Sequence, residues 1–222
     1  MATQIAGLVA SRSHGFLFIH IPKTAGGSLK RALLAQCPDA VSPEIAAQGL
    51  QRAVGVPLPT AVKNMIARSV QYGPLRFLVT TTGHPTAALI FLAHPKFHAY
   101  RKFAFVRNPF DRIVSAYEYA RQQEGYDEEF SCFVEDCPRR LQPQVNFVFF
   151  YRKLMVDWIG RFERLEEDVE SLRGWLGLPE LMLPHRNKTV RTRYEDYLTP
   201  SLKRRIIDVY GADFAAFDYA HA

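Results

Sequence analysis

Short apolar runs alternate with stretches of helical periodicity along this chain. Three runs have the length and composition of buried parallel strands: residues 15–21, 103–106 and 157–162. Each is followed by apolar positions at helical spacing, at residues 28–35, 113–120 and 166–176. Ser28 is expected to cap the first of these helices, because its hydroxyl can accept a hydrogen bond from a first-turn amide. A weaker strand at residues 75–80 and helices over residues 83–92 and 200–210 complete the pattern.

Strands that alternate with helices predict an α/β fold in three layers, with a mostly parallel central sheet flanked by helices on both faces. We expect a single domain over residues 1–222, because a chain in which 48% of the residues are hydrophobic can bury a sizeable core. Residues 38–75 contain five prolines, which favour loops and short surface helices, and residues 126–150 show no clear period. Aromatic residues in and after the second region either fill a core, which we favour, or stack on sugar rings: Tyr126, Phe130, Phe147, Phe149, Phe150 and Tyr151.

Charge and cysteine content narrow the class of protein. Lysine and arginine outnumber aspartate and glutamate by 28 to 22, and the resulting net charge of +6 favours anionic ligands. Three cysteines are an odd number for a chain of this size, which argues against a disulfide framework and for a reducing compartment. No apolar run approaches the roughly 18 residues of a membrane span. We therefore expect a cytoplasmic protein without stable membrane insertion.

Residues 21–29, Ile-Pro-Lys-Thr-Ala-Gly-Gly-Ser-Leu, join the first predicted strand to the first predicted helix. A strand that enters a helix through glycines presents backbone N–H groups and the positive end of the helix dipole, and both attract phosphate. Lys23 adds a cation, and Thr24 and Ser28 add hydroxyl donors. In the common nucleotide-binding loop the Lys-Ser/Thr pair follows the glycines, whereas here it precedes them. This order weakens an interpretation as a kinase or NTPase.

A second candidate anion site lies in residues 103–117. Arg107 ends the predicted strand and Ser115 lies in the early turns of the next helix. Because ligands of parallel sheets bind at the carboxyl ends of the strands, both segments should open onto the same edge. Two anion sites on one edge fit a ligand with two separated phosphates.

Together, the segments Ile-Pro-Lys-Thr-x-Gly-Gly-Ser and Val-Arg-Asn-Pro-x-Asp-Arg-x-x-Ser-x-Tyr resemble the two motifs with which the sulfotransferase superfamily binds 3'-phosphoadenosine 5'-phosphosulfate (PAPS). The similarity is closer to the branch of carbohydrate (heparan and chondroitin) O-sulfotransferases and their bacterial relatives, and it extends to residues 160–165, 183–188 and 210–214. It implies a P-loop-like α/β fold, PAPS as the sulfuryl donor, PAP as the product and no metal.

The same resemblance assigns roles to individual residues. Those implied to hold the 5'-phosphosulfate are Lys23, Thr24, Ala25, Gly26, Gly27 and Ser28. Those implied to hold the 3'-phosphate are Arg107 and Ser115, and a looser match has Lys188 and Arg191 close over the nucleotide. Lys23 would also neutralise the oxygen of the departing PAP.

Transfer to a hydroxyl also needs a base to remove its proton. His84 follows a predicted strand in a Gly-His context that resembles the family's, which makes it the candidate base. Glu163 is an alternative base or a brace for its loop, and His20 is expected to be a packed residue. The implied acceptor is a hydroxyl of a saccharide, no nucleic acid partner is expected, and the oligomeric state is left open.

Two other functions stay open at this point. A kinase would need an acidic residue at a strand end to hold Mg²⁺, and Asp157 is the tempting candidate although it precedes its strand. A non-catalytic module would instead bind polyanions on its basic surface, with strong salt dependence. His94 and His98 have i, i+4 spacing without a carboxylate to complete a metal set, so we expect no metal site.

Overall fold

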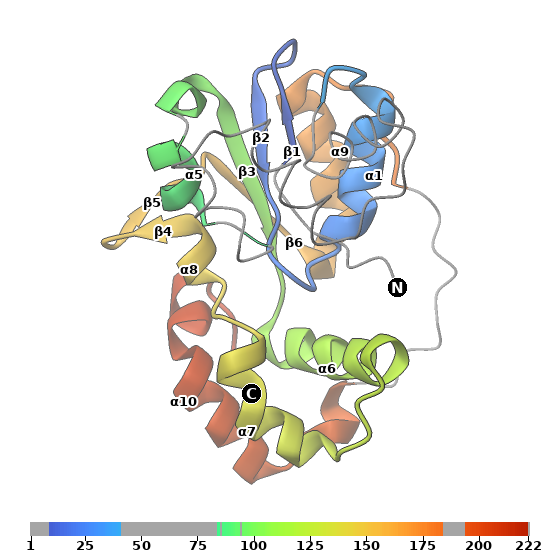
Figure 1. Cartoon of the computed structure of the whole chain (residues 1–222), viewed down its shortest axis with the longest axis vertical. Helices are drawn as coiled ribbons and strands as arrows, with labels where there is room; N and C mark the ends of the chain where they lie inside the picture. Colours follow the sequence, from blue (N-terminus) through green and yellow to red (C-terminus); the bar gives the residue numbers. More distant parts are fainter. Residues whose placement is uncertain (1–8, 41–83, 85, 94, 184–193, 222) are drawn as a thin grey trace, which may run out of the picture.

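The central sheet of the computed structural model has the strand order β1-β2-β3-β6 (Figure 1). The structure describes residues 9–40, 84, 86–93, 95–183 and 194–221. The strands are β1 (Val9–Ser11), β2 (Phe16–Ile19), β3 (Arg101–Val106) and β6 (Trp158–Arg161). β2, β3 and β6 run parallel, and β1 pairs antiparallel with β2. The carboxyl ends of the three parallel strands therefore meet at one edge.

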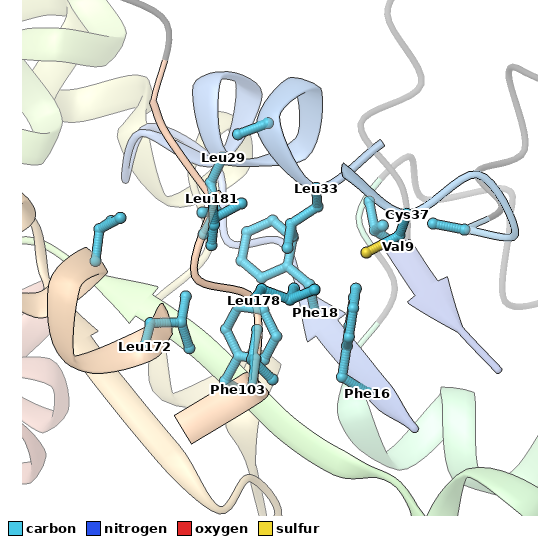
Figure 2. Packing of buried hydrophobic residues seen from close by; sticks show 14 of the residues in the cluster. Val9, Phe16, Phe18, Leu29, Leu33, Cys37, Phe103, Leu172, Leu178 and Leu181 are labelled. Carbon is cyan, nitrogen blue, oxygen red and sulfur yellow. The ribbon is translucent and has the colours of Figure 1, made fainter. Parts of the chain in front are cut away.

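Helices cover both faces of the sheet. Because successive side chains of a strand point to opposite faces, each strand contributes residues to two apolar clusters. On one face, Phe16, Phe18 and Phe103 pack against α1 (Gly26–Gln36) and α9 (Leu165–Leu176) (Figure 2). On the other face, Leu17 and Ile19 pack in a cluster with residues of α5 (Ala87–Ala93) and α8 (Val145–Val148). The mostly parallel sheet flanked by helices confirms the expected fold class.

A third group of helices lies beyond the carboxyl edge of the sheet (Figure 1). It comprises α6 (Pro109–Tyr119), α7 (Phe130–Arg140) and α10 (Pro200–Ala216), which share one apolar cluster. A π-helical turn, η3 (Ala120–Glu124), continues α6. The remaining elements are η2 (Pro95–Ala99), η4 (Phe162–Arg164), η5 (Tyr194–Tyr197) and the hairpin of β4 (Phe149–Phe150) and β5 (Lys153–Leu154).

Most predicted elements are confirmed, with some shifted bounds. The first helix begins at Gly26, so its N-cap is Ala25 and the expectation that Ser28 caps it was wrong. The last helix is kinked at Tyr210, the predicted end, where φ is −111° and ψ is 16°, and a further segment continues to Ala216. The strand expected at residues 75–80, and nearly all of residues 38–75, lie outside the described residues.

The region around residues 126–150 holds α7, α8 and the start of the hairpin, none of which the sequence pattern predicted. Its aromatic residues divide between two environments. Phe130 and Phe147 are buried in the core, as favoured, whereas Phe150 and Tyr151 are 51% and 90% exposed on the hairpin. None of the helices in the described part of the chain has the length and apolar character needed to span a membrane.

Candidate active site

Three connections emerge from the carboxyl edge of the sheet, and they carry most of the predicted site residues. The loop after β2 contains Lys23 and Thr24, the loop after β3 begins with Arg107, and η4 after β6 contains Glu163. Arg107 Nη1 donates to the Lys23 carbonyl oxygen at 3.1 Å. The two predicted anion-binding segments are thus in direct contact.

Four consecutive carbonyl oxygens of the β2–α1 loop accept hydrogen bonds from side chains. The His20 oxygen is bonded by His84 Nδ1 at 3.1 Å, and the Ile21 oxygen by Thr24 Oγ1 at 2.9 Å. The Pro22 oxygen is bonded by Arg112 Nε at 3.0 Å, next to the bond from Arg107 to Lys23. With its carbonyls held in this way, the loop presents a fixed backbone at the start of α1.

The backbone of this loop is strained at two residues. Lys23 has φ 68° and Ala25 has φ 66°, both in the left-handed region that non-glycine residues rarely adopt. Such conformations cost on the order of 1–3 kcal/mol each and occur preferentially at functional sites. The surrounding hydrogen bonds keep the loop in this conformation.

In the first turn of α1 the amides of Ser28 and Leu29 both donate to the Ala25 carbonyl oxygen, at 3.0 and 3.2 Å, so the predicted backbone donors to an anion are the amides at the very start of the helix. Amides at this position have no acceptor within the helix, and Gly27 in this turn is exposed. Gly26 is required because a Cβ there would lie 1.8 Å from Cδ2 of His20. His20 is therefore a packed residue, as expected. Thr24 and Ser28 are buried, and Thr24 directs its hydroxyl to the Ile21 oxygen.

Arg107 is buried and oriented by three neighbours. Its Nε donates to Asp111 Oδ2 at 2.7 Å, and its guanidinium carbon lies 4.0 Å from the centre of the Phe162 ring. Gln144 accepts from the Arg107 amide at 2.9 Å and donates to its carbonyl at 2.8 Å. Ser115, four residues after Asp111, is partly exposed on the same face of α6. Asp111 and the Lys23 carbonyl oxygen thus fix the direction of the Arg107 guanidinium through Nε and Nη1.

Lys23 extends from the loop toward α6. Its Nζ lies 4.0 Å from the centre of the Tyr119 ring, at the last residue of this helix. Tyr119 is four residues after Ser115, so the two share a face of the helix. The ammonium group therefore lies on the side of α6 that carries the predicted 3'-phosphate residue.

His84 has the tautomer that a general base needs. A carbonyl oxygen can only accept, so Nδ1 carries the hydrogen of its bond to His20, and Nε2 keeps its lone pair. Burial lowers the pKa of His84 to about 4, an effect that the bond to His20 opposes and the charges of Arg112 and Lys30 strengthen. The imidazole is consequently neutral at physiological pH. Burial, followed by the charges of His84 and Lys30, also lowers the pKa of His20.

Arg112 belongs to the site and the sequence analysis missed it. The side chain is 1% exposed, donates from Nη1 to the Gln142 oxygen at 2.9 Å and lies 3.9 Å from Asp213. Burial lowers its pKa to about 10 although Asp213 opposes this shift, so Arg112 stays a cation at neutral pH. Within the described part of the chain, its Nη2 is buried and makes no hydrogen bond. Arg112 is the arginine of the Asn-Pro-x-Asp-Arg segment, so the motif contained it, but arginine side chains are rarely buried.

Other predicted residues fall in different places. Glu163 accepts from the Asn108 amide at 2.6 Å and from the Tyr219 hydroxyl at 3.0 Å, which is the bracing role. Asp157 precedes β6 at the opposite edge of the sheet and bonds the Lys102 amide at 2.7 Å, which disfavours the kinase interpretation. Lys188, Arg191 and His94 lie outside the described residues.

Comparisons with known proteins bear on this site. The family model described as "Sulfotransferase family" matches residues 7–220. An uncharacterized protein from Archaeoglobus fulgidus is 34% identical over 93 residues, which are 38% of this chain and 73% of that protein. A crystal structure of a sulfotransferase from Alicyclobacillus acidocaldarius is similar with a TM-score of 0.46 and 16% identity, over 92% of this chain and 94% of that chain.

Proposed function

This chain belongs to the sulfotransferase family, and from that premise we propose that it transfers the sulfuryl group of PAPS to a hydroxyl of a saccharide. The observation that carries the proposal is the hydrogen bond from Arg107 to the Lys23 oxygen, 3.1 Å long. It joins two anion-binding segments into one site, as a donor with phosphate groups at both its 3' and 5' positions requires.

The described residues fit such a donor at two points. The amides at the start of α1, together with Lys23, would hold the 5'-phosphosulfate, because helix N-termini and cations both favour bound anions. The guanidinium of Arg107 and the hydroxyl of Ser115 would hold the 3'-phosphate. Lys188 and Arg191 are proposed to close over the nucleotide. PAPS supplies an activated sulfuryl group and leaves as PAP, and no metal is proposed because Lys23 and Arg107 supply the positive charge.

His84 is the proposed general base. Its Nε2 lone pair would take the proton of the acceptor hydroxyl as the oxygen attacks sulfur, while Nδ1 stays bonded to the His20 oxygen at 3.1 Å. A pKa of about 4 keeps the base unprotonated before the donor binds. The negative charge of a bound donor would raise this pKa toward the working pH, and so strengthen the base when it is needed.

Lys23 is the proposed electrostatic catalyst. Negative charge develops on the oxygen that links sulfur to PAP as that bond breaks, and a fixed ammonium stabilises it most in the transition state. The bonds that hold residues 20–23 fix the backbone of Lys23 before any ligand binds. The loop therefore supplies positioning, which dominates catalysis in transfers of this type.

We also propose a single domain over residues 1–222 and a cytoplasmic location. The match to one family model over residues 7–220 supports the first. The second is supported by the three cysteines, Cys37, Cys132 and Cys137, all of which are unpaired. The oligomeric state is left open.

The test is a transfer assay with sulfur-labelled PAPS and a panel of oligosaccharides, phenols and alcohols. We expect a sulfated saccharide and PAP in equal amounts. Lys23→Ala should lower kcat by roughly 10²–10³-fold, as expected for the loss of a group that stabilises developing charge. Lys153→Ala, a control on the exposed hairpin, should leave kcat unchanged.

Sulfation of phenols or alcohols alone would keep PAPS as the donor and remove the saccharide. An absence of PAPS-dependent product with every hydroxyl acceptor would contradict the proposed reaction.

A further inference from the structure

Tyr119 is an aromatic residue at the site that the proposed mechanism does not use. Its ring is 42% exposed at the end of α6, and the Lys23 ammonium lies 4.0 Å from its centre. An ammonium over the face of an aromatic ring is attracted by the ring's quadrupole. The contact joins the cation of the β2–α1 loop to the helix that carries Ser115.

The residues before Tyr119 anchor the end of α6. Glu118 accepts a hydrogen bond from the hydroxyl of Tyr197, and Tyr117 is buried in the apolar cluster of α6, α7 and α10. Directly after Tyr119 the helix widens into the π-helical turn η3. Such turns are rare and occur frequently at functional sites.

Lys23 is thereby held at both ends. Its carbonyl oxygen accepts from Arg107 at 3.1 Å, and its ammonium lies over Tyr119. Without a contact at its far end, a lysine side chain samples many rotamers, because four flexible methylenes separate the charge from the backbone. The ring limits this freedom by holding the ammonium 4.0 Å from its centre.

We propose that Tyr119 is a positioning residue for sulfuryl transfer, whose ring holds the Lys23 ammonium in place to stabilise the charge that develops on the leaving oxygen. The inference rests on the proposed function. Since Lys23 would act mainly in the transition state, loss of the ring should lower kcat more than it weakens the binding of PAPS.

The test compares Tyr119→Leu, Tyr119→Phe and the control Tyr151→Leu, which removes an exposed ring from the hairpin. Tyr119→Leu should lower kcat by about twofold to fivefold, as expected for a partly exposed cation–π contact, with little change in KM for PAPS. Tyr119→Phe keeps the ring and should retain the kcat of the wild type, as should Tyr151→Leu. An unchanged kcat in Tyr119→Leu, or an equal loss in Tyr119→Phe, would overturn the proposal.

A second measurement reads the contact without any enzymatic activity. The rate of acetylation of Lys23 by an amine-reactive reagent is followed by mass spectrometry in the same variants. Because the ring covers one side of the ammonium, Tyr119→Leu should raise this rate about twofold to fivefold, and Tyr119→Phe should not. Equal rates in all variants would overturn the contact itself. Altered rates with no PAPS-dependent transfer in the wild type would contradict the proposed function and leave the contact in place.

Discussion

The carbonyl oxygens of residues 20–23 accept hydrogen bonds from four side chains, those of His84, Thr24, Arg112 and Arg107. Three of these side chains were predicted to bind the donor or to act as the base. In the structure each also holds the loop in a strained conformation. Removal of any one of them therefore changes the loop as well as the chemistry, and variants must be chosen to separate the two effects.

His84→Asn separates them at the candidate base. An asparagine amide can still donate to the His20 oxygen, but it offers no lone pair with the basicity of an imidazole. We expect kcat to fall by roughly 10²–10⁴-fold, the usual contribution of a general base, while the temperature of unfolding changes little. The measurement is steady-state kinetics with calorimetric scans of both proteins. Near-normal turnover in His84→Asn would place the base elsewhere.

The pH dependence of kcat/KM for the wild-type enzyme gives a second test of His84 as the base. A base whose pKa lies at about 4 stays active as pH falls through 6.5, so the acid limb of kcat/KM for PAPS, where the rate falls, should appear only near pH 4. An acid limb at the ordinary histidine value of about 6.5 would contradict a buried His84 as the base in the free enzyme.

At the scale of elements, α6 is the centre of the site. It carries Arg112, Ser115 and Tyr119, and its start is well specified by the sequence, with Asn108 accepting from the Phe110 amide at 2.9 Å and Pro109 in the first turn. Asp213 of α10 contacts both α6 and the start of α8. It accepts from the Gln144 and Val145 amides at 2.8 and 2.9 Å and faces Arg112 at 3.9 Å.

Asp213→Ala should therefore destabilise the fold strongly. The variant leaves the charge of Arg112 buried without its carboxylate and two amides without their acceptor, and breaking a buried pair typically costs about 3–5 kcal/mol. Glu135→Gln is the matched control, because it breaks the exposed ion pair of Glu135 with Arg205, 3.1 Å apart, and such pairs contribute about 0–1 kcal/mol. The measurement is urea unfolding of both variants. An equal, small loss in each would show that Asp213 does not join these helices.

The sequence predicted those elements whose signals are local. β2, β3 and β6 follow from short apolar runs with a clear end, and α9 follows from its periodicity. β1 was missed because three residues carry little pattern. The β4–β5 hairpin was missed because Tyr151 and Arg152 occupy its turn at φ 43° and 66°, where glycine or asparagine is the usual signal.

The candidate site was predictable in part for the same reason. Lys23 lies in one short sequence motif, and Arg107 and Ser115 lie in another. The rule that parallel strands end at one edge predicted that the two motifs are close in space. The burial of Arg112 and the contact of Lys23 with Tyr119 depend on packing between distant segments, which no local pattern encodes. The role of Glu163 could not be predicted from the sequence for the same reason. Only its hydrogen-bond partners, Asn108 and Tyr219, distinguish a brace from a base.

At the scale of the whole molecule, one edge of the sheet collects the residues that could bind a donor with two anionic ends. The acidic residue that a kinase would need, Asp157, lies at the other edge, where it forms an ion pair with Lys102 at 3.0 Å. The net charge of +6 alone would also fit a module that binds polyanions, but such binding would not depend on a 3'-phosphate. The dependence on that group is thus the property that separates these functions.

Calorimetric titration of the protein with PAP, 5'-AMP and ATP, without added metal, tests this property most directly and requires no acceptor. We predict that PAP binds about 10- to 100-fold more tightly than 5'-AMP, since hydrogen bonds from Arg107 and Ser115 to a charged phosphate contribute about 1.5–3 kcal/mol. Equal affinities for PAP and 5'-AMP, or binding of ATP that requires Mg²⁺, would contradict the assignment of PAPS as the donor.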